Sequence, residues 1–172
     1  METRWMYVTS ENFEQLREEA KGVCVIPMGC VEKHGLHLPL GTDVFEADAL
    51  AYMASQIEPV CIFPTFIFGD VPENYPAMAP GSITLPVETE MLLLDQLCDQ
   101  IARNGFKKII ILNTHGGNNA WLTTFLRKLE NRPHDYVVVV VEMKSEIAGR
   151  IAQRILDDGR EAFPDLTDED VE

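Results

Sequence analysis

The sequence has 172 residues, of which 46% are hydrophobic and 24% are charged, and its formal net charge is −14. A chain of this length and composition supports one domain with a hydrophobic core. Its acidity, without any basic stripe, argues against nucleic acid or an anionic membrane as a partner.

The N-terminal stretch METRWMYVTSENFEQL contains no apolar leader, and no run approaches the roughly 18 apolar residues of a membrane span. The four cysteines, Cys24, Cys30, Cys61 and Cys98, show no CxxC spacing. Cysteines inside apolar runs usually behave as small hydrophobic residues. We therefore expect a cytoplasmic protein in a reducing compartment, without a disulfide framework.

Apolar runs of strand length alternate along the chain with longer stretches of helical period. The first strand is predicted at 22–29 (GVCVIPMG). A helix follows at 42–57, where apolar residues recur at helical spacing. A second strand region at 60–69 is interrupted by Pro64, and residues 70–86 are too rich in proline for a helix.

The second half of the chain continues this alternation. An amphipathic helix is predicted at 87–105, with acidic residues in its first turn and a glycine at its end. Buried strands at 107–113 and 135–143 are followed by helices at 118–131 and 145–158. Apolar strands that are each followed by a helix indicate an α/β fold, in which a largely parallel sheet is covered on both faces. Ligands of such sheets bind at the carboxyl ends of the strands.

The stretch VEKHGLHLPLGTD, which follows the first predicted strand, concentrates groups that bind protons or metals. Glu32 and His34 are two residues apart, so in an extended segment both side chains point to the same side. A carboxylate and an imidazole placed in this way suit a divalent ion such as Zn²⁺ or Mn²⁺. Asp43 opens the next helix and has two interpretations, a helix cap paired with Glu46 or a further ligand.

A second polar stretch, ILNTHGGNN, follows the predicted strand at 107–113. His115 lies just beyond the carboxyl end of that strand. Gly116 and Gly117 would let the backbone pass close to a ligand, and Asn118 is a candidate cap for the following helix. The alternative is an ordinary strand-to-helix turn with one polar histidine. Four candidate ligands at the carboxyl ends of two strands favour a metal-binding site over an ordinary turn.

These residues resemble the motifs of a known family. PMGCVEKHGLHLPLGTD is similar to the P-x-G-S-x-E-Q-H-G-x-H-L-P-L-x-T-D signature of the creatininase family of metal-dependent amidohydrolases. NTHGGN resembles the N-G-H-G-G-N of that family, and APGSITL resembles its F-P-G-T-I-S-L segment. The three motifs occur in the family's order, and the resemblance runs from about residue 20 to residue 145.

The resemblance implies a three-layer α/β/α sandwich, assembled into homo-oligomers that are often hexamers, with one or two Zn²⁺ or Mn²⁺ ions per subunit. By position, the metal ligands would be Glu32, His34, Asp43 and His115, and Asp43 would bridge two ions. In creatininase a glutamate ligand stands two residues after the motif histidine. Gly117 occupies that position here.

Family members usually continue with an H-A-G-E-x-E-T-S motif, which the printed sequence does not contain. Residues 1–156 are therefore expected to form a single creatininase-like domain without the family's usual C-terminal part, and residues 157–172 an acidic tail. Within the printed chain, His37 and Glu73 are the candidate proton donors. His37 also has an alternative role, as a group that fixes the loop around the ligands.

The leading hypothesis is a metal-dependent hydrolase that cleaves the C–N amide bond of a small cyclic or linear amide through metal-activated water. The alternative is a non-catalytic metal-binding or assembly protein derived from the same family. A nucleotide-binding module is disfavoured because no GxGxxG or Walker loop follows a strand. A serine hydrolase is disfavoured because the sequence has no G-x-S-x-G.

Overall fold

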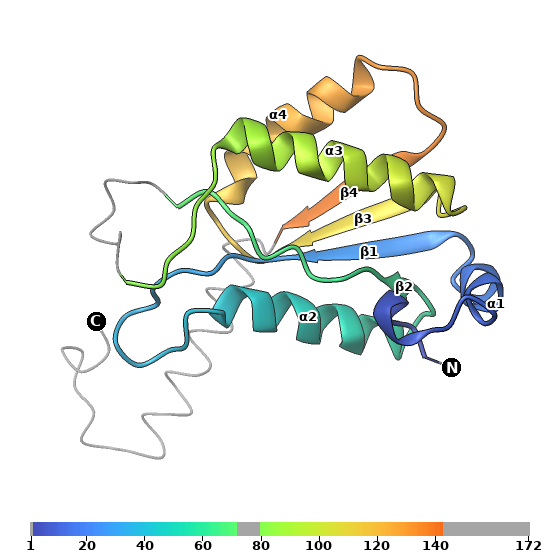
Figure 1. Ribbon diagram of the computed structural model, residues 1–172, viewed down its shortest axis with the longest axis horizontal. Coiled ribbons are helices and arrows are strands. Elements are labelled where there is room, and N and C mark those ends of the chain that lie inside the picture. The colour runs from blue at the N-terminus through green and yellow to red at the C-terminus, as the bar shows by residue number, and fades with distance from the viewer. Residues whose placement is uncertain (1, 72–79, 143–172) are drawn as a thin grey trace. The chain divides into compact units, whose positions relative to one another are not determined.

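A computed structural model describes residues 2–71 and 80–142 (Figure 1). These residues belong to one compact unit, Met1–Glu142. The candidate proton donor Glu73, the helix predicted at 145–158 and the acidic tail predicted at 157–172 lie outside the described residues. None of the described helices has both the length and the apolar character needed to cross a membrane.

The centre of the fold is a parallel sheet. Its strands are β1 (Val23–Met28), β2 (Cys61–Ile62), β3 (Lys108–Asn113) and β4 (Val137–Glu142), in the spatial order β2-β1-β3-β4. Each adjacent pair runs parallel. The predicted parallel sheet is therefore confirmed, and the apolar character of β1 agrees with its burial from the second residue onward.

Helices cover both faces of this sheet (Figure 1). Helix α2 (Thr42–Ser55) lies on one face, and α3 (Val87–Arg103) and α4 (Asn118–Glu130) lie on the other. The three-layer α/β/α architecture is therefore confirmed. A short 3₁₀ helix, η1 (Trp5–Tyr7), and helix α1 (Phe13–Glu19) precede β1 and were not predicted. Both are short and bury almost no side chains, so they leave little hydrophobic periodicity in the sequence.

The two faces of the sheet have different cores. Toward α3 and α4, alternate residues of β1 and β3 join a large cluster of buried side chains, among them Ile26, Ile111, Leu122 and Phe125. Toward α2 the cluster is small, and Val25 and Ile62 pack against Ala51. Small residues on α2 let this helix lie close to the sheet, which brings its first turn next to the end of β1.

The strand order places the carboxyl ends of β1 and β3 side by side, with Met28 opposite Asn113. From β1 the chain goes outward to β2 and then returns to β3 on the other side of β1. In doubly wound sheets such a reversal opens a crevice at the carboxyl ends of the two central strands. The two polar stretches of the sequence follow these two strands, so the topology brings them together.

Three sequence-based expectations were wrong in detail. The second strand covers only Cys61–Ile62, and beyond Pro64 only an isolated bridge joins Phe66 to Met28, because proline cannot donate to a ladder of hydrogen bonds. Neither Asp43 nor Asn118 is a helix cap. Helix α2 is capped by Gly41 and α4 by Gly117, in both cases without a side-chain hydrogen bond.

Candidate metal centre

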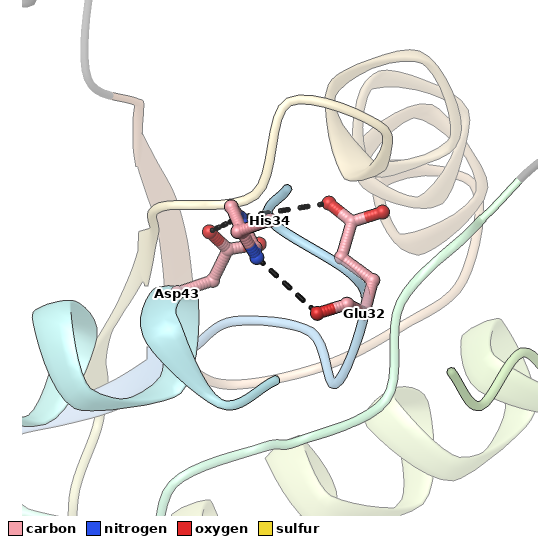
Figure 2. A group of neighbouring side chains, drawn as sticks. All are labelled: Glu32, His34 and Asp43. Atoms are coloured by element: carbon pink, nitrogen blue, oxygen red, sulfur yellow. Dashed lines mark hydrogen bonds and ion pairs between the residues drawn. The ribbon is translucent and has the colours of Figure 1, made fainter. Parts of the chain in front are cut away.

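Three predicted ligands meet between the loop after β1 and the start of α2 (Figure 2). Glu32, His34 and Asp43 each offer a donor atom, and these atoms lie within 4.8 Å of one another. His34 Nε2 is 2.9 Å from Asp43 Oδ1 and 3.9 Å from Glu32 Oε1. The expectation that Glu32 and His34 point to the same side of their segment is confirmed.

Asp43 reaches this position because it lies in the first turn of α2. The unpaired N–H groups and the dipole of a helix N-terminus stabilise a negative charge there. Its carbonyl oxygen is 2.8 Å from Thr114 Oγ1, and the Met28 carbonyl is 3.1 Å from the same hydroxyl, whose single proton is available to either oxygen. The start of α2 is therefore tied to the ends of β1 and β3, and the Asp43 side chain is buried.

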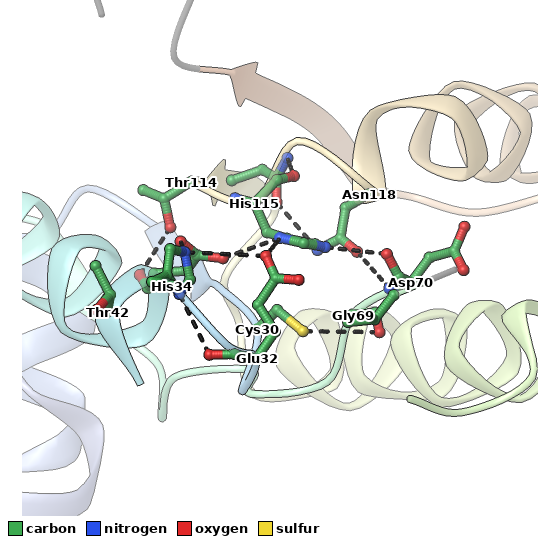
Figure 3. A network of polar contacts seen from close by, with 12 residues as sticks. Cys30, Glu32, His34, Thr42, Gly69, Asp70, Thr114, His115 and Asn118 are labelled. Atoms are coloured by element: carbon green, nitrogen blue, oxygen red, sulfur yellow. Dashed lines mark hydrogen bonds and ion pairs between the residues drawn. The ribbon is translucent and has the colours of Figure 1, made fainter. Parts of the chain in front are cut away.

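His115 approaches the same carboxylates from the turn after β3 (Figure 3). Its Nδ1 is 2.9 Å from Asp43 Oδ2 and 3.2 Å from Glu32 Oε1. The two oxygens of Asp43 thus face different imidazoles, Oδ1 that of His34 and Oδ2 that of His115. The structure brings all four predicted ligands together, from two segments that are about 70 residues apart in the chain.

The second nitrogen of each imidazole faces a backbone carbonyl oxygen. His34 Nδ1 is 3.3 Å from the carbonyl oxygen of Glu32, and His115 Nε2 is 3.0 Å from that of Asp70. Carbonyl and carboxylate oxygens are both acceptors, so each imidazole lies between acceptors on its two sides. A metal ion on the carboxylate side would take the lone pair of that nitrogen, while the other nitrogen would keep its proton on the carbonyl. Metal-binding histidines are commonly oriented in this way by a backbone carbonyl.

The electrostatics of the cluster favour a cation. Burial by itself lowers the pKa of His115, but hydrogen bonds to Asp43 and to the Asp70 carbonyl, together with the charge of Glu32, raise it above its ordinary value. Burial and the charge of Asp43 also raise the pKa of Glu46. Negative charge thus accumulates around Asp43, and either a proton on His115 or a metal ion relieves it.

Cys30 lies near the centre. Its Sγ is 3.8 Å from the carbonyl oxygen of Gly69. Burial and the charges of Glu32, Asp43 and Glu90 raise the pKa of its thiol to about 12. Without a metal ion the thiol therefore remains protonated at neutral pH, which makes it a poor nucleophile.

Glu90 is a buried acid that the sequence analysis did not single out. It lies in the first turns of α3 and is 0% exposed, and neither carboxyl oxygen has a hydrogen-bond partner. Burial, and to a smaller degree the charge of Asp70, raise its pKa to about 7, although the Leu85 amide and His115 oppose the shift. The sequence showed only acidic residues in the first turn of a helix, a pattern typical of exposed positions.

The remaining predicted site residues have different surroundings. His37 is exposed on the loop between β1 and α2. Gly116 is exposed, whereas Gly117 lies against the carbonyl of Asp70. Asn118 is fully buried, and its side chain receives a hydrogen bond from the backbone N–H of Asp70.

Comparison with known proteins identifies relatives of the chain. Residues 6–163 match the model of the creatininase family, described as creatinine amidohydrolase. A 3-dehydro-scyllo-inosose hydrolase from Thermotoga maritima is 32% identical over 116 residues, which cover 64% of this chain and 36% of that protein.

Solved creatininase structures share the fold. A crystal structure of creatinine amidohydrolase has a TM-score of 0.72 at 19% identity and covers 96% of this chain and 64% of its own. A manganese form of creatininase has a TM-score of 0.73 at 18% identity, covering 97% of this chain and 66% of its own. A Zn–Zn form of creatininase has a TM-score of 0.70 at 18% identity and covers 97% of this chain and 66% of its own. The chain thus spans about two thirds of these structures and about a third of the Thermotoga protein.

Proposed function

Because the chain belongs to the creatininase family, we propose that it is a metal-dependent hydrolase that cleaves the C–N amide bond of a small cyclic or linear amide. The observation that carries this proposal is the convergence of Glu32, His34, Asp43 and His115, in which each histidine directs one nitrogen at the carboxylates and the other at a backbone carbonyl.

The donor set fits Zn²⁺ or Mn²⁺. Two carboxylates and two imidazoles are the oxygen and nitrogen ligands that such ions accept. Donor atoms bound to one zinc ion at roughly 2.0–2.2 Å are themselves separated by roughly 3 Å. The separations of 2.9 and 3.2 Å from His115 Nδ1 to Asp43 and Glu32 support one such position, and the 2.9 Å contact between His34 and Asp43 supports another. Asp43 would then bridge two ions.

A bound divalent ion would supply Lewis acidity, activating water and polarising a substrate carbonyl. The protein residues supply charge balance, orientation of the ligands and a proton for the leaving group. Glu32 and Asp43 balance the cationic charge, and the backbone carbonyls of Glu32 and Asp70 keep the imidazoles oriented. The leaving amine requires a proton donor. We propose His37 or Glu73 for this role, together with Gly116, Gly117 and Asn118 as the turn that shapes the substrate side of the centre.

The relatives guide the choice of substrates and assembly. The matched family is named for creatinine, and the Thermotoga relative for 3-dehydro-scyllo-inosose. We therefore propose a small molecule as substrate. From the motif resemblance we propose a homo-oligomer, with the hexamer as the expected form. From the cysteine pattern we propose a cytoplasmic location.

Metal content tests this function most directly. The full chain, purified without chelator, should contain one or two equivalents of Zn²⁺ or Mn²⁺ by mass spectrometry. Glu32→Gln should lose metal, whereas Glu88→Gln, the same change at an exposed position of α3, should retain it. A folded wild-type chain that takes up neither ion would exclude the proposed centre.

Activity is measured separately on creatinine, linear amides, formamides and 3-dehydro-scyllo-inosose, each with and without chelator. Turnover of an amide that disappears with chelator is the expected result. Turnover of 3-dehydro-scyllo-inosose alone, a compound without a C–N bond, would contradict the proposed amide cleavage. A chain that binds metal but turns over none of these compounds would support the alternative, a non-catalytic metal-binding or assembly protein.

A further inference from the structure

The orientation of His115 depends on one backbone group from a distant segment. The carbonyl oxygen of Asp70 lies 3.0 Å from His115 Nε2, on the side of the ring opposite Asp43 and Glu32. Without a metal both ring nitrogens face acceptors, and the Asp70 oxygen holds the ring with Nδ1 toward the two carboxylates. When Nδ1 binds a metal ion, the remaining ring proton is on Nε2 and this oxygen accepts it. If the oxygen moved away, the ring could turn and Nδ1 would lose its position.

Side-chain hydrogen bonds from α4 hold Asp70 at this distance. The backbone N–H of Asp70 donates to Asn118 Oδ1 (3.1 Å), and the same oxygen accepts a hydrogen bond from Trp121 Nε1 (3.0 Å). Asn118 Nδ2 donates to Asn113 Oδ1 at 3.1 Å. Asn118 is 0% and Trp121 4% exposed, so water cannot readily replace these partners.

Two glycines allow the close approach between the Asp70 segment and the ring. A Cβ atom at Gly69 would lie 3.0 Å from both His115 Cδ2 and Asn118 Oδ1. A Cβ atom at Gly117 would fall against the Asp70 carbonyl oxygen and within 2.6 Å of His115 Nε2. A side chain at Gly117 would therefore separate the Asp70 oxygen and His115 Nε2, the two atoms whose contact positions the ring.

We propose that Trp121 and Asn118 are positioning residues for the metal centre, acting through the backbone of Asp70 to hold the His115 ring with Nδ1 toward Glu32 and Asp43. This inference rests on the proposed metal-dependent function. Trp121 lies one helical turn after Asn118 on α4, and its indole N–H fixes the orientation of the Asn118 amide. A residue that forms no hydrogen bond to the ligands thereby influences how His115 presents Nδ1 to a metal ion.

The test uses the full chain and the variant Trp121→Phe, which keeps an aromatic ring but removes the indole N–H. The matched control is Trp5→Phe, in a cluster with Phe13, Phe63 and Phe106. Competition against a chelator gives the Zn²⁺ dissociation constant. We expect Trp121→Phe to weaken Zn²⁺ binding about tenfold or more, the effect typical of partners that orient a metal-binding histidine. Trp5→Phe should stay within about twofold.

A second variant and a second readout separate this inference from the proposed function. Gly117→Ala acts on the same contact without altering the core, so it applies even if Trp121→Phe fails to fold. Proton NMR of the metal-free chain, at a pH where both ring nitrogens are protonated, should show the His115 Nε2 proton protected from solvent exchange in the wild type, because it is donated to the Asp70 carbonyl. Both variants should show faster exchange of this proton.

The outcomes are distinct. Wild-type Zn²⁺ affinity and unchanged exchange of the His115 Nε2 proton in both variants would overturn the positioning role. A wild-type chain that binds no Zn²⁺ would overturn the proposed function, and the NMR measurement on the metal-free chain would still decide whether Asn118 and Trp121 hold the Asp70 carbonyl against His115.

Discussion

The candidate centre consists of two halves that are built differently. The loop half contains Glu32 and His34, in the long connection between β1 and α2, where Leu36 is 96% exposed. The buried half contains His115, which is 6% exposed in the short turn between β3 and α4. Asp43 faces both halves, with one oxygen toward each imidazole.

The two halves are also held by different interactions. The loop half depends on backbone contacts, such as the hydrogen bond from the Glu32 N–H to the Leu40 carbonyl, and on the Lys33 N–H donating to Ser82 Oγ. The buried half depends on a network of buried asparagine side chains and an indole. An imidazole that faces Asp43 can therefore come from an exposed loop or from a packed turn. Its replacement should destabilise the fold to different degrees in the two halves.

The largest effect is expected where the halves meet. Asp43→Asn keeps the side-chain shape but removes the charge that faces both imidazoles. We expect Zn²⁺ affinity to fall more than 100-fold, beyond the range for residues that only orient a ligand. Chelator competition measures this. A loss of less than tenfold would show that the two halves bind metal without a shared carboxylate.

The next test compares the two imidazoles directly. His34→Ala and His115→Ala should both weaken metal binding, but only His115→Ala should strongly destabilise the metal-free chain. It leaves a cavity and a buried Asp70 carbonyl without its donor, which costs about 1–3 kcal/mol. Urea unfolding should show a smaller change for His34→Ala, whose side chain is partly exposed. Equal destabilisation would contradict the distinction between the halves.

Glu90 allows a pH test of the surroundings of the buried half. The pKa of Glu90 in the folded chain is raised to about 7. At low pH the carboxyl is protonated in both the folded and the unfolded chain, so no charge is buried. As the pH rises through 7, the unfolded chain ionises more readily than the folded one, and the free energy of unfolding falls. Glu90→Gln should remove roughly 2 kcal/mol of this loss between pH 5 and pH 8. Unfolding at both pH values is compared with Glu88→Gln, an exposed control. Identical pH dependence in all three proteins would show that Glu90 is not held in a desolvated site.

The smallest effect is expected from His37 in the loop half. It is exposed and belongs to none of the contacts among the four ligands. His37→Ala should therefore leave Zn²⁺ affinity within about twofold of wild type. A proton-donor role would instead appear as a loss of roughly 100-fold or more in turnover at unchanged metal content. A large loss of affinity would mean that His37 is part of the metal centre.

The positions of β1, β3, β4 and helices α2 to α4 followed from the sequence to within a few residues. Apolar runs of strand length and helical spacing reflect burial, and burial is what the sheet and its covering helices impose on these segments. The same reasoning failed for α1, which buries little, and for the region after Pro64, where a missing N–H ended the strand. The candidate ligands were identified because two short stretches that follow predicted strands contain metal-binding residue types at the spacing of the family motifs they resemble.

What the sequence alone determined, then, is the alternation of elements and the presence of four candidate metal-binding side chains after two of the strands. The tertiary structure decided how they meet. Placing β3 beside β1 brings His115 to Asp43, and the carbonyl of Asp70, with Asn118 and Trp121 behind it, lies against the opposite side of the His115 ring. These contacts join segments far apart in the chain, and two of them use backbone groups of Asp70, which every residue carries. No local pattern of side chains could therefore have revealed them.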